Sequence, residues 1–152
     1  MSVKAIHNFE HAVHAANEWI KELANEPEVG SESQAYAILR IVLQALRDRM
    51  RVEEVAQLSA QLPMLIRGFF FEGWKPQYEQ SPPESSEEFL EDIGLRLLRV
   101  SEIEAEDAVY LVYALMHQHF SAGELVHVER VMPAELVLKW RPGLPQKGLR
   151  LV

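Results

Sequence analysis

Two proline-containing dipeptides, 70 residues apart, limit what this chain can fold into. Leu62-Pro63 recurs as Met132-Pro133, and the helical patterns around the two dipeptides align at the same offset. Apolar and capping positions keep their character while exposed positions drift, as expected of a duplicated helical unit. We therefore predict two copies of one supersecondary unit that share a core. The paired positions are Val42 with Val112, Leu46 with Met116, Glu54 with Glu124, Val55 with Leu125, Leu58 with Val128, Ile66 with Leu136 and Phe70 with Trp140.

The start of each copy aligns only at a different offset. An offset of 80 pairs Phe9 with Phe89 and Val13 with Ile93. A change of offset requires extra residues between the first two helices of the first copy. The sequence therefore predicts a longer inter-helix loop in the first copy.

The two copies are predicted to form a single domain over residues 1–152, because this length is typical of one domain. The first copy spans about residues 6–73 and the second about residues 86–140. A proline- and serine-rich linker over residues 74–85 joins them, and an irregular tail over residues 141–152 follows.

Apolar residues recur at intervals of three and four, the period of amphipathic helices. The first helix is expected to turn this stripe toward the core. Its end is predicted before Pro27, and Gly73 is predicted to end the fourth helix as a left-handed cap. No stretch alternates long enough to predict a strand, so the fold class is all-α, with about four helices in each copy. The stripe of the first helix consists of Ile6, Phe9, Val13, Ala16, Ile20 and Leu23.

The composition argues against several classes of partner. The chain carries 23 acidic and 15 basic residues, a net charge of −8, which repels nucleic-acid phosphates. The longest apolar run covers residues 108–116, far short of the roughly 20 residues that span a bilayer. The chain has no cysteine, which fits a reducing compartment. We expect a soluble, acidic, cytoplasmic protein that contacts neither nucleic acid nor membrane.

A histidine face on the first helix is the main candidate metal site. His7, His11, His14 and Glu18 follow one another at intervals of four, three and four residues, so their side chains share one helix face and could bind zinc or a similar ion. A helical wheel places this face about 160° from the apolar stripe, away from the core. A solvated polar face explains the same pattern, and we expect no cofactor.

Four aromatic residues form the main candidate interface. Three consecutive phenylalanines cover about 200° of a helix and cannot all face one core. The repeat pairs Phe70 with Trp140 and predicts that Phe70 is the core member. Phe69, Phe71 and Trp74 are then candidates for a surface that contacts a protein partner or a second copy. Alternatively, the linker and the tail fold over them.

The ordered motifs of the chain resemble a large bacterial family of helical proteins, domain of unknown function 2267. The resemblance covers nearly the whole chain, with one departure: Phe69-Phe70-Phe71 stands where a tyrosine is expected. It implies an all-helical soluble domain and brings no catalytic residues. The motifs are residues 39–49, Glu53-Glu54, Gln61-Leu62-Pro63, residues 65–68, Glu72-Gly73-Trp74, Phe89-Leu90, residues 121–124, Met132-Pro133 and Leu136.

No catalytic or phosphate-binding motif accompanies these patterns. The first hypothesis is a non-enzymatic helical module for protein interaction or self-association, through the aromatic residues. The second is a small-ligand or metal-binding domain that uses the cleft between the copies or the His7, His11 and His14 face. The third is a helical enzyme whose residues the sequence does not reveal. We favour the first, and with it a protein without enzymatic activity.

Overall fold

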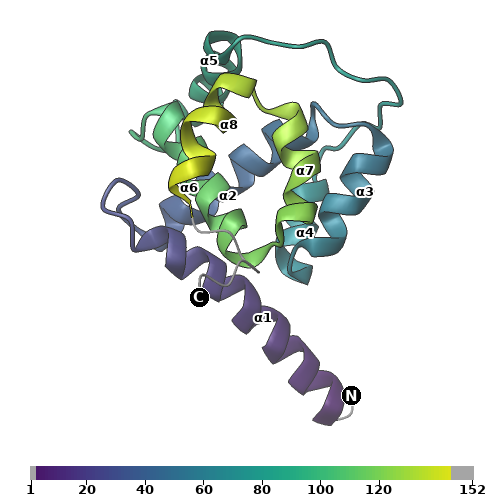
Figure 1. Cartoon of the computed structure of the whole chain (residues 1–152). Coiled ribbons are helices and arrows are strands. Elements are labelled where there is room, and N and C mark those ends of the chain that lie inside the picture. Colours follow the sequence, from purple (N-terminus) through teal and green to yellow (C-terminus); the bar gives the residue numbers. More distant parts are fainter. Residues whose placement is uncertain (1–2, 145–152) are drawn as a thin grey trace, which may run out of the picture.

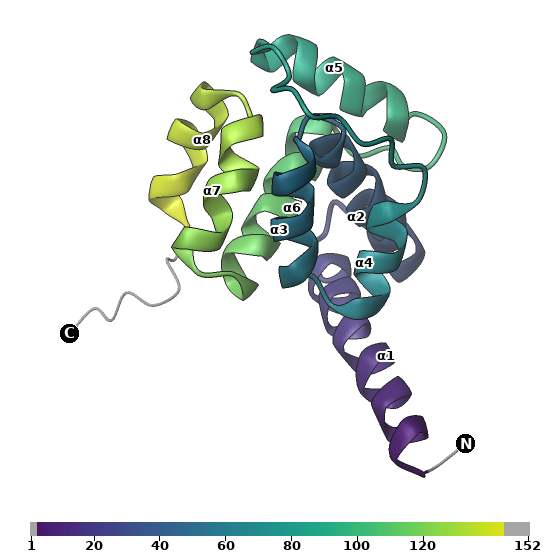
Figure 2. The ribbon, with the colours of Figure 1, turned by 90° about the vertical axis from the view of Figure 1, so that its right-hand side faces the viewer.

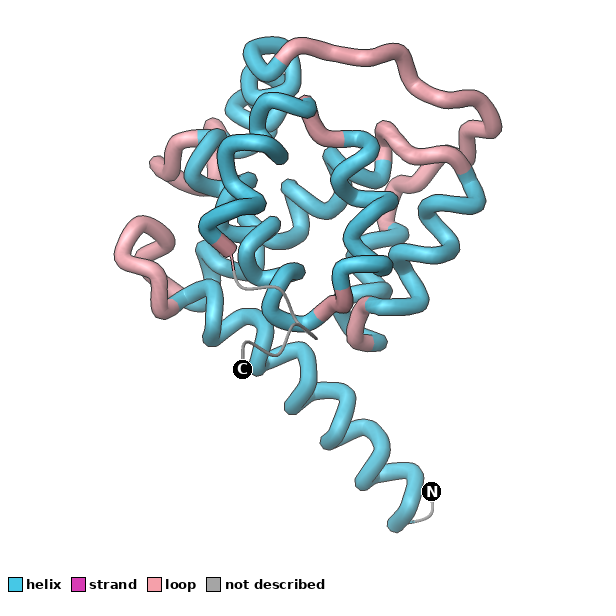
Figure 3. Tube along the Cα trace, viewed as in Figure 1, coloured by secondary structure: helices cyan, strands magenta, loops and turns pink. Residues whose placement is uncertain are grey.

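The computed structural model describes residues 3–144, and within this range every regular element is a helix (Figures 1 and 3). The predicted all-α fold is confirmed. A short 3-10 helix lies in the segment predicted to be irregular, and residues 145–152 of that tail fall outside the described residues. The helices are α1 (Val3–Ala24), α2 (Glu32–Arg47), α3 (Val52–Gln61), α4 (Met64–Phe71), α5 (Ser86–Leu97), α6 (Ala105–His119), α7 (Ala122–Val131), α8 (Ala134–Trp140) and η1 (Arg141–Gly143).

Local sequence signals set several of the helix ends. The Ser31 hydroxyl accepts a hydrogen bond from the amide of Gln34, 3.1 Å away, and so caps the start of α2. Ser85 caps α5 in the same way through the amide of Glu88. Gly73 has a φ of +72°, so the predicted left-handed cap after α4 is confirmed.

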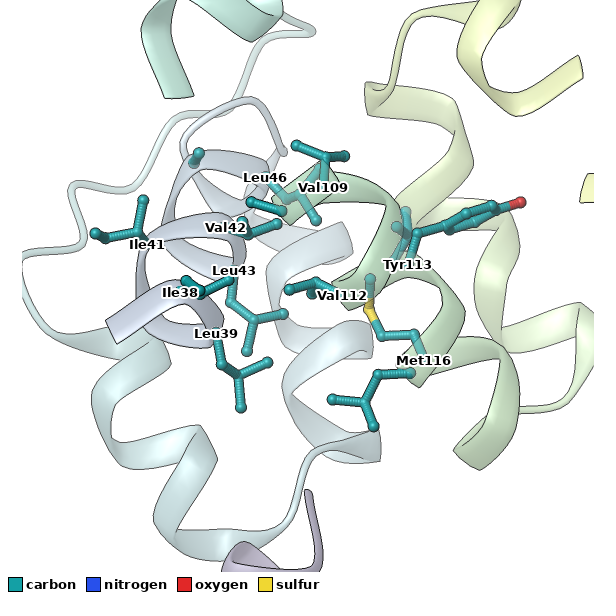
Figure 4. Close-up of a cluster of buried hydrophobic side chains, with 14 of the residues drawn as sticks. Ile38, Leu39, Ile41, Val42, Leu43, Leu46, Val109, Val112, Tyr113 and Met116 are labelled. Carbon is teal, nitrogen blue, oxygen red and sulfur yellow. The ribbon is translucent and has the colours of Figure 1, made fainter. Parts of the chain in front are cut away.

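Helices α2 and α6 form the centre of the core. Nine of the 16 residues of α2 are buried, because α1, α4, α5 and α6 all contact this helix. Val42 and Leu46 of α2 and Val112 and Met116 of α6 belong to one cluster of buried side chains (Figure 4). These four side chains belong to the pairs that the repeat predicted, and all of them are buried. The centre of the protein therefore joins the two halves of the sequence.

The buried positions of the first helices contradict the predicted change of offset. Phe9 and Val13 are exposed, so they are not the equivalents of two buried residues in α5. The predicted longer loop is also wrong, since residues 25–31 and residues 98–104 both contain seven residues. In these helices too, buried residues recur at an offset of 70 residues. Whether the two halves superpose stays a prediction. The buried pairs are Trp19 with Phe89 and Leu23 with Ile93.

Helix α1 extends beyond the rest of the molecule. Its N-terminal end projects from the body in two perpendicular views (Figures 1 and 2). It is the longest helix, with 22 residues. Within residues 3–144, no helix combines the length and the apolar character that crossing a bilayer requires. We call residues 3–15 the arm.

Candidate interaction surface

The arm exposes the apolar stripe that the sequence predicted to face the core. Ile6, Phe9 and Val13 are 47%, 57% and 49% exposed, and none of residues 4–15 is buried. The expectation that these three side chains contribute to the core is wrong. The helical period alone determines which residues share a face, and it does not determine where the neighbouring helices end. A shallow depression of about 400 Å³ follows the exposed stripe, lined by Ile6, Phe9, Glu10, Val13, His14 and Asn17.

The second half of α1, which includes the last residues of the same stripe, fixes the base of the arm to the body. Trp19 is buried and stacks on the His119 ring of α6, with 4.6 Å between ring centroids. The His119 Nε2 atom lies 2.8 Å from a carboxylate oxygen of Glu22. Leu23 is also buried. The second half of α1 is therefore held firmly, and it directs the arm outward as a continuous helix.

The predicted histidine face lies on the arm and is exposed to solvent. The His7 and His11 rings contact each other edge to face, with 4.8 Å between ring centroids. The His14 Nε2 atom lies 3.8 Å from the carboxylate of Glu18. Among the described residues, no three histidine, aspartate or glutamate side chains are arranged to hold a metal ion. A metal site on this face is therefore not preformed, and metal binding there stays a prediction.

The aromatic segment of α4 is largely covered by the protein's own helices. Phe70 is fully buried, which confirms that it is a core residue. Phe69 is only 8% exposed and contacts the Tyr36 ring edge to face, so this interface candidate is covered within the molecule. Helix α4 contacts both α1 and α2, and a helix covered from two sides buries more than one face. Phe71 and Trp74 are half-buried and contact each other; their role in an interface stays a prediction.

Arg47 is a buried cation whose role the sequence did not reveal. It is 4% exposed, and its Nη1 atom donates to the carbonyl oxygens of Phe70, at 2.8 Å, and Glu72, at 2.6 Å. These carbonyls stand at the end of α4, where they have no partner within the helix. The Gln44 amide donates to the Phe69 carbonyl. Two side chains of α2 therefore fix the end of α4.

Arg49 connects the linker to α5. Its guanidinium forms ion pairs with Glu84 of the linker and with Asp92 of α5. Burial raises the pKa of Asp92, but hydrogen bonds from Arg96 and Arg49 outweigh this effect and lower it. Arg49 was not singled out from the sequence. Its partners lie 35 and 43 residues away, so no local pattern could have identified them.

A second polar cluster joins α6, α7 and the 3-10 helix. The Tyr113 hydroxyl donates to the Glu129 carboxylate, which also accepts hydrogen bonds from Arg141. Burial raises the pKa of Glu129, and the bonds from Arg141 and Tyr113 more than reverse this, so the pKa is lowered. Burial and the bond to Glu129 raise the pKa of Tyr113. His117 and Glu129 border a cavity of about 360 Å³. The polar groups of Tyr113, Glu129 and Arg141 are hydrogen bonded to one another.

One small cavity borders the first copy, the linker and the second copy. It has a volume of about 300 Å³ and lies between the linker and the turn that joins α7 to α8. Its two cations are engaged, since Arg49 pairs with Glu84 and Arg130 lies 3.5 Å from Glu54. Ligand binding in this cavity stays a prediction that no polar group there favours.

Comparison with known proteins adds a family and no activity. No curated protein matches this chain. The family model described as "Uncharacterized conserved protein (DUF2267)" matches residues 16–138, which leaves the arm outside the matched region. The match covers well over half of the sequence, and the chain therefore belongs to the DUF2267 family.

Proposed function

We propose that this protein is a non-enzymatic self-association module, in which the arm of one molecule pairs with the arm of a second copy. The observation that carries the proposal is the exposed apolar stripe of Ile6, Phe9 and Val13. A contiguous apolar stripe on a helix that leaves the body is typical of an interaction site. We take the cytoplasm as its place of action, and its net charge of −8 argues against nucleic acid as a partner.

The spacing of the stripe fits a paired helix. Ile6, Phe9, Val13 and Ala16 follow one another at intervals of three, four and three residues, the a and d positions of a heptad. The positions that flank this seam hold Ala5, Ala12 and Asn17, together with Glu10. Three of these four flanks are small or neutral, which allows two helices to approach closely with little like-charge repulsion.

Charge favours a second copy as the occupant. The whole chain has a net charge of −8, whereas residues 4–17 contain one lysine, one glutamate and three histidines. Arms can therefore meet without the repulsion that acidic bodies would experience. Antiparallel pairing keeps the two bodies at opposite ends of a contact about 20 Å long, since a helix rises about 1.5 Å per residue. We infer that the arms pair antiparallel.

The contact is small, so the association should be weak. Three apolar side chains per arm bury far less than the roughly 800 Å² per partner of a standard stable interface. We expect a dissociation constant weaker than about 1 µM, which corresponds to about 8 kcal/mol of binding free energy. Sedimentation velocity at protein concentrations from about 5 to 500 µM covers this range. We expect the wild-type protein to shift from monomer to dimer across this range, and Phe9→Glu to remain a monomer.

Leu138→Glu is the matched control. Leu138 is 75% exposed on α8, away from the arm, so it tests an apolar-to-acid change on a different surface. We expect this variant to associate like the wild type. A wild-type protein that stays monomeric at the highest concentration would refute the proposal. So would equal disruption by both variants, since the effect would then be one of charge alone.

Spin labels can establish the orientation of the pair. The chain contains no cysteine, so Lys4→Cys provides a single attachment site per molecule. Antiparallel arms centred near Phe9 place the two position-4 backbones about 20 Å apart, whereas parallel arms place them about 10 Å apart. A short distance would leave self-association intact and reject the antiparallel arrangement.

A further inference from the structure

A second exposed apolar surface lies on helices that the arm does not use. A groove of about 970 Å³ follows α5 and the loop from α5 to α6. Leu95 and Leu98 are 65% and 74% exposed along it, and Leu90 and Ile103 are half-buried in its lining. The groove therefore presents aliphatic side chains to solvent over more than two helical turns.

Acidic side chains surround this apolar floor. No lysine, arginine or histidine contributes to the lining. Among the ion pairs of residues 3–144, only Glu106 of these acids has a cationic partner, the Lys139 ammonium at 2.8 Å. Most of the negative charge around the groove is thus not neutralised by the described part of the protein. The six acids of the lining are Glu87, Glu91, Glu102, Glu104, Glu106 and Asp107.

Helix dipoles account for four of these six acids. Three of the six occupy the first turns of α5 and α6, where negative charge stabilises a helix. Glu104 is the N-cap residue of α6 and lies at the same end of the dipole. Glu91 lies further along α5, and Glu102 lies in the loop. The two remaining carboxylates have no such local reason, and the unneutralised negative charge of the lining favours a cationic occupant.

We propose that this groove binds a cationic amphipathic helix of a partner protein. Such a helix places its apolar face in a hydrophobic groove, and its flanking lysines or arginines meet the carboxylates of the rim. The same rim repels nucleic acids and anionic membranes. The inference goes beyond self-association, because the arm and the groove belong to different helices and attract different partners.

A synthetic helix provides the direct probe. A fluorescent peptide of about 18 residues, with leucines on one face and lysines on the other, spans about 27 Å. It is titrated with the full chain, and fluorescence anisotropy measures binding. We expect saturable binding that weakens with salt. Glu91→Lys/Glu102→Lys should weaken it about tenfold or more, because it replaces attraction by repulsion at two rim positions.

Two controls separate the groove from general electrostatics. Glu79→Lys/Glu135→Lys changes the net charge equally at exposed positions outside the lining, and it should change the affinity by less than about threefold. A scrambled peptide of the same composition should bind at least about tenfold more weakly, because its leucines no longer share a face. Equal effects of the two double variants, or equal binding of both peptides, would overturn the proposal.

Gly94→Leu tests the groove without changing charge. A Cβ atom at Gly94 would lie 3.8 Å from the Cβ of Ala105, an ordinary contact, and leucine favours the helix more than glycine does. The variant should therefore fold, as circular dichroism can verify, while its side chain occupies the groove. We expect peptide binding to fall about tenfold, the loss of roughly 1.4 kcal/mol. Unchanged affinity would show that the peptide binds elsewhere.

Discussion

The short helices α4 and α8 end the two halves of the chain, and different chemistry secures them. Backbone carbonyls at the end of α4 accept hydrogen bonds from the buried Arg47 of α2. Beyond α8, Arg141 pairs with Glu129 of α7, which also accepts from Tyr113 of α6. In the first half a buried cation, itself paired with Asp48, binds neutral acceptors of α4, and in the second a carboxylate binds two donors.

The anchoring of α4 and the anchoring of α8 should therefore respond differently to pH. Carbonyl oxygens do not change charge with pH, so their contribution to the anchoring of α4 is constant. Glu129 can be protonated, and the anchoring of α8 therefore depends on acidity. Similar helical positions in the two halves can thus carry the same apolar residues and different polar ones. The variants below test how far this comparison holds.

Phe70→Ala should have the largest effect, a loss of about 3–5 kcal/mol in the free energy of unfolding, because it leaves a cavity in the core. Phe70 is fully buried and lies between Phe69 and Phe71 in the sequence of α4. Chemical denaturation measures the change. Leu138→Ala, at an exposed position, is the control and should stay within about 0.5 kcal/mol of the wild type. A loss below about 1 kcal/mol for Phe70→Ala would contradict the observed burial.

Arg47→Met should come next, with a loss of about 2–4 kcal/mol, because it leaves the Phe70 and Glu72 carbonyls without their donor. Methionine preserves much of the side-chain length, so the loss reports the polar contacts of Arg47, which include its ion pair with Asp48. Arg99→Met, at an exposed position, controls for the change in net charge. If both variants lose equal stability, the carbonyl contacts contribute little to the anchoring of α4.

Glu129→Gln should cost about 1–2 kcal/mol at neutral pH, because the ionic bond to Arg141 is lost. The pKa of Glu129 is lowered in the folded protein from its ordinary value of 4.5. The added stability is therefore present above pH 4.5 and disappears as the pH falls through the folded pKa. Denaturation curves of the two proteins should converge in acid, while the deficit of Arg47→Met persists. A Glu129→Gln deficit that does not change with pH would reject this assignment.

Pro63→Ala should have the smallest effect, a loss of about 0.5–1 kcal/mol, mainly through the greater freedom of the unfolded chain. Pro63 precedes the first residue of α4, and its carbonyl accepts from the Arg67 amide in either variant. Pro133 is buried, so Pro133→Ala should lose more. Thermal unfolding can rank the two. The reverse order would mean that packing around Pro133 does not contribute.

Local signals carried much of the fold. Serine caps, Gly73 and the apolar period of α2 and α6 act within a few residues of the chain, so their consequences could be predicted. The burial of Phe70 followed from its pairing with Trp140 at the offset of 70 residues. These features need no knowledge of distant neighbours.

The candidate surfaces depended on distant neighbours and could not be predicted. The arm has the same apolar period as the buried part of α1, and only the extent of the surrounding helices leaves Phe9 exposed. Phe69 is buried because α1 and α2 both cover α4. Arg47 reaches carbonyls 23 and 25 residues away. In each case tertiary packing decided the environment of a residue whose local pattern allowed several.

The contact between Glu22 and His119 joins residues 97 positions apart, and Trp19 stacks on the same ring. During synthesis at about 5–20 residues per second, the indole emerges from the ribosome roughly 5–20 seconds before the imidazole that covers it. Until α6 is made, a nascent chain therefore exposes apolar side chains on both the arm and the base of α1. The speed of translation between the codons for Trp19 and His119 sets how long this surface is accessible to chaperones or to neighbouring chains.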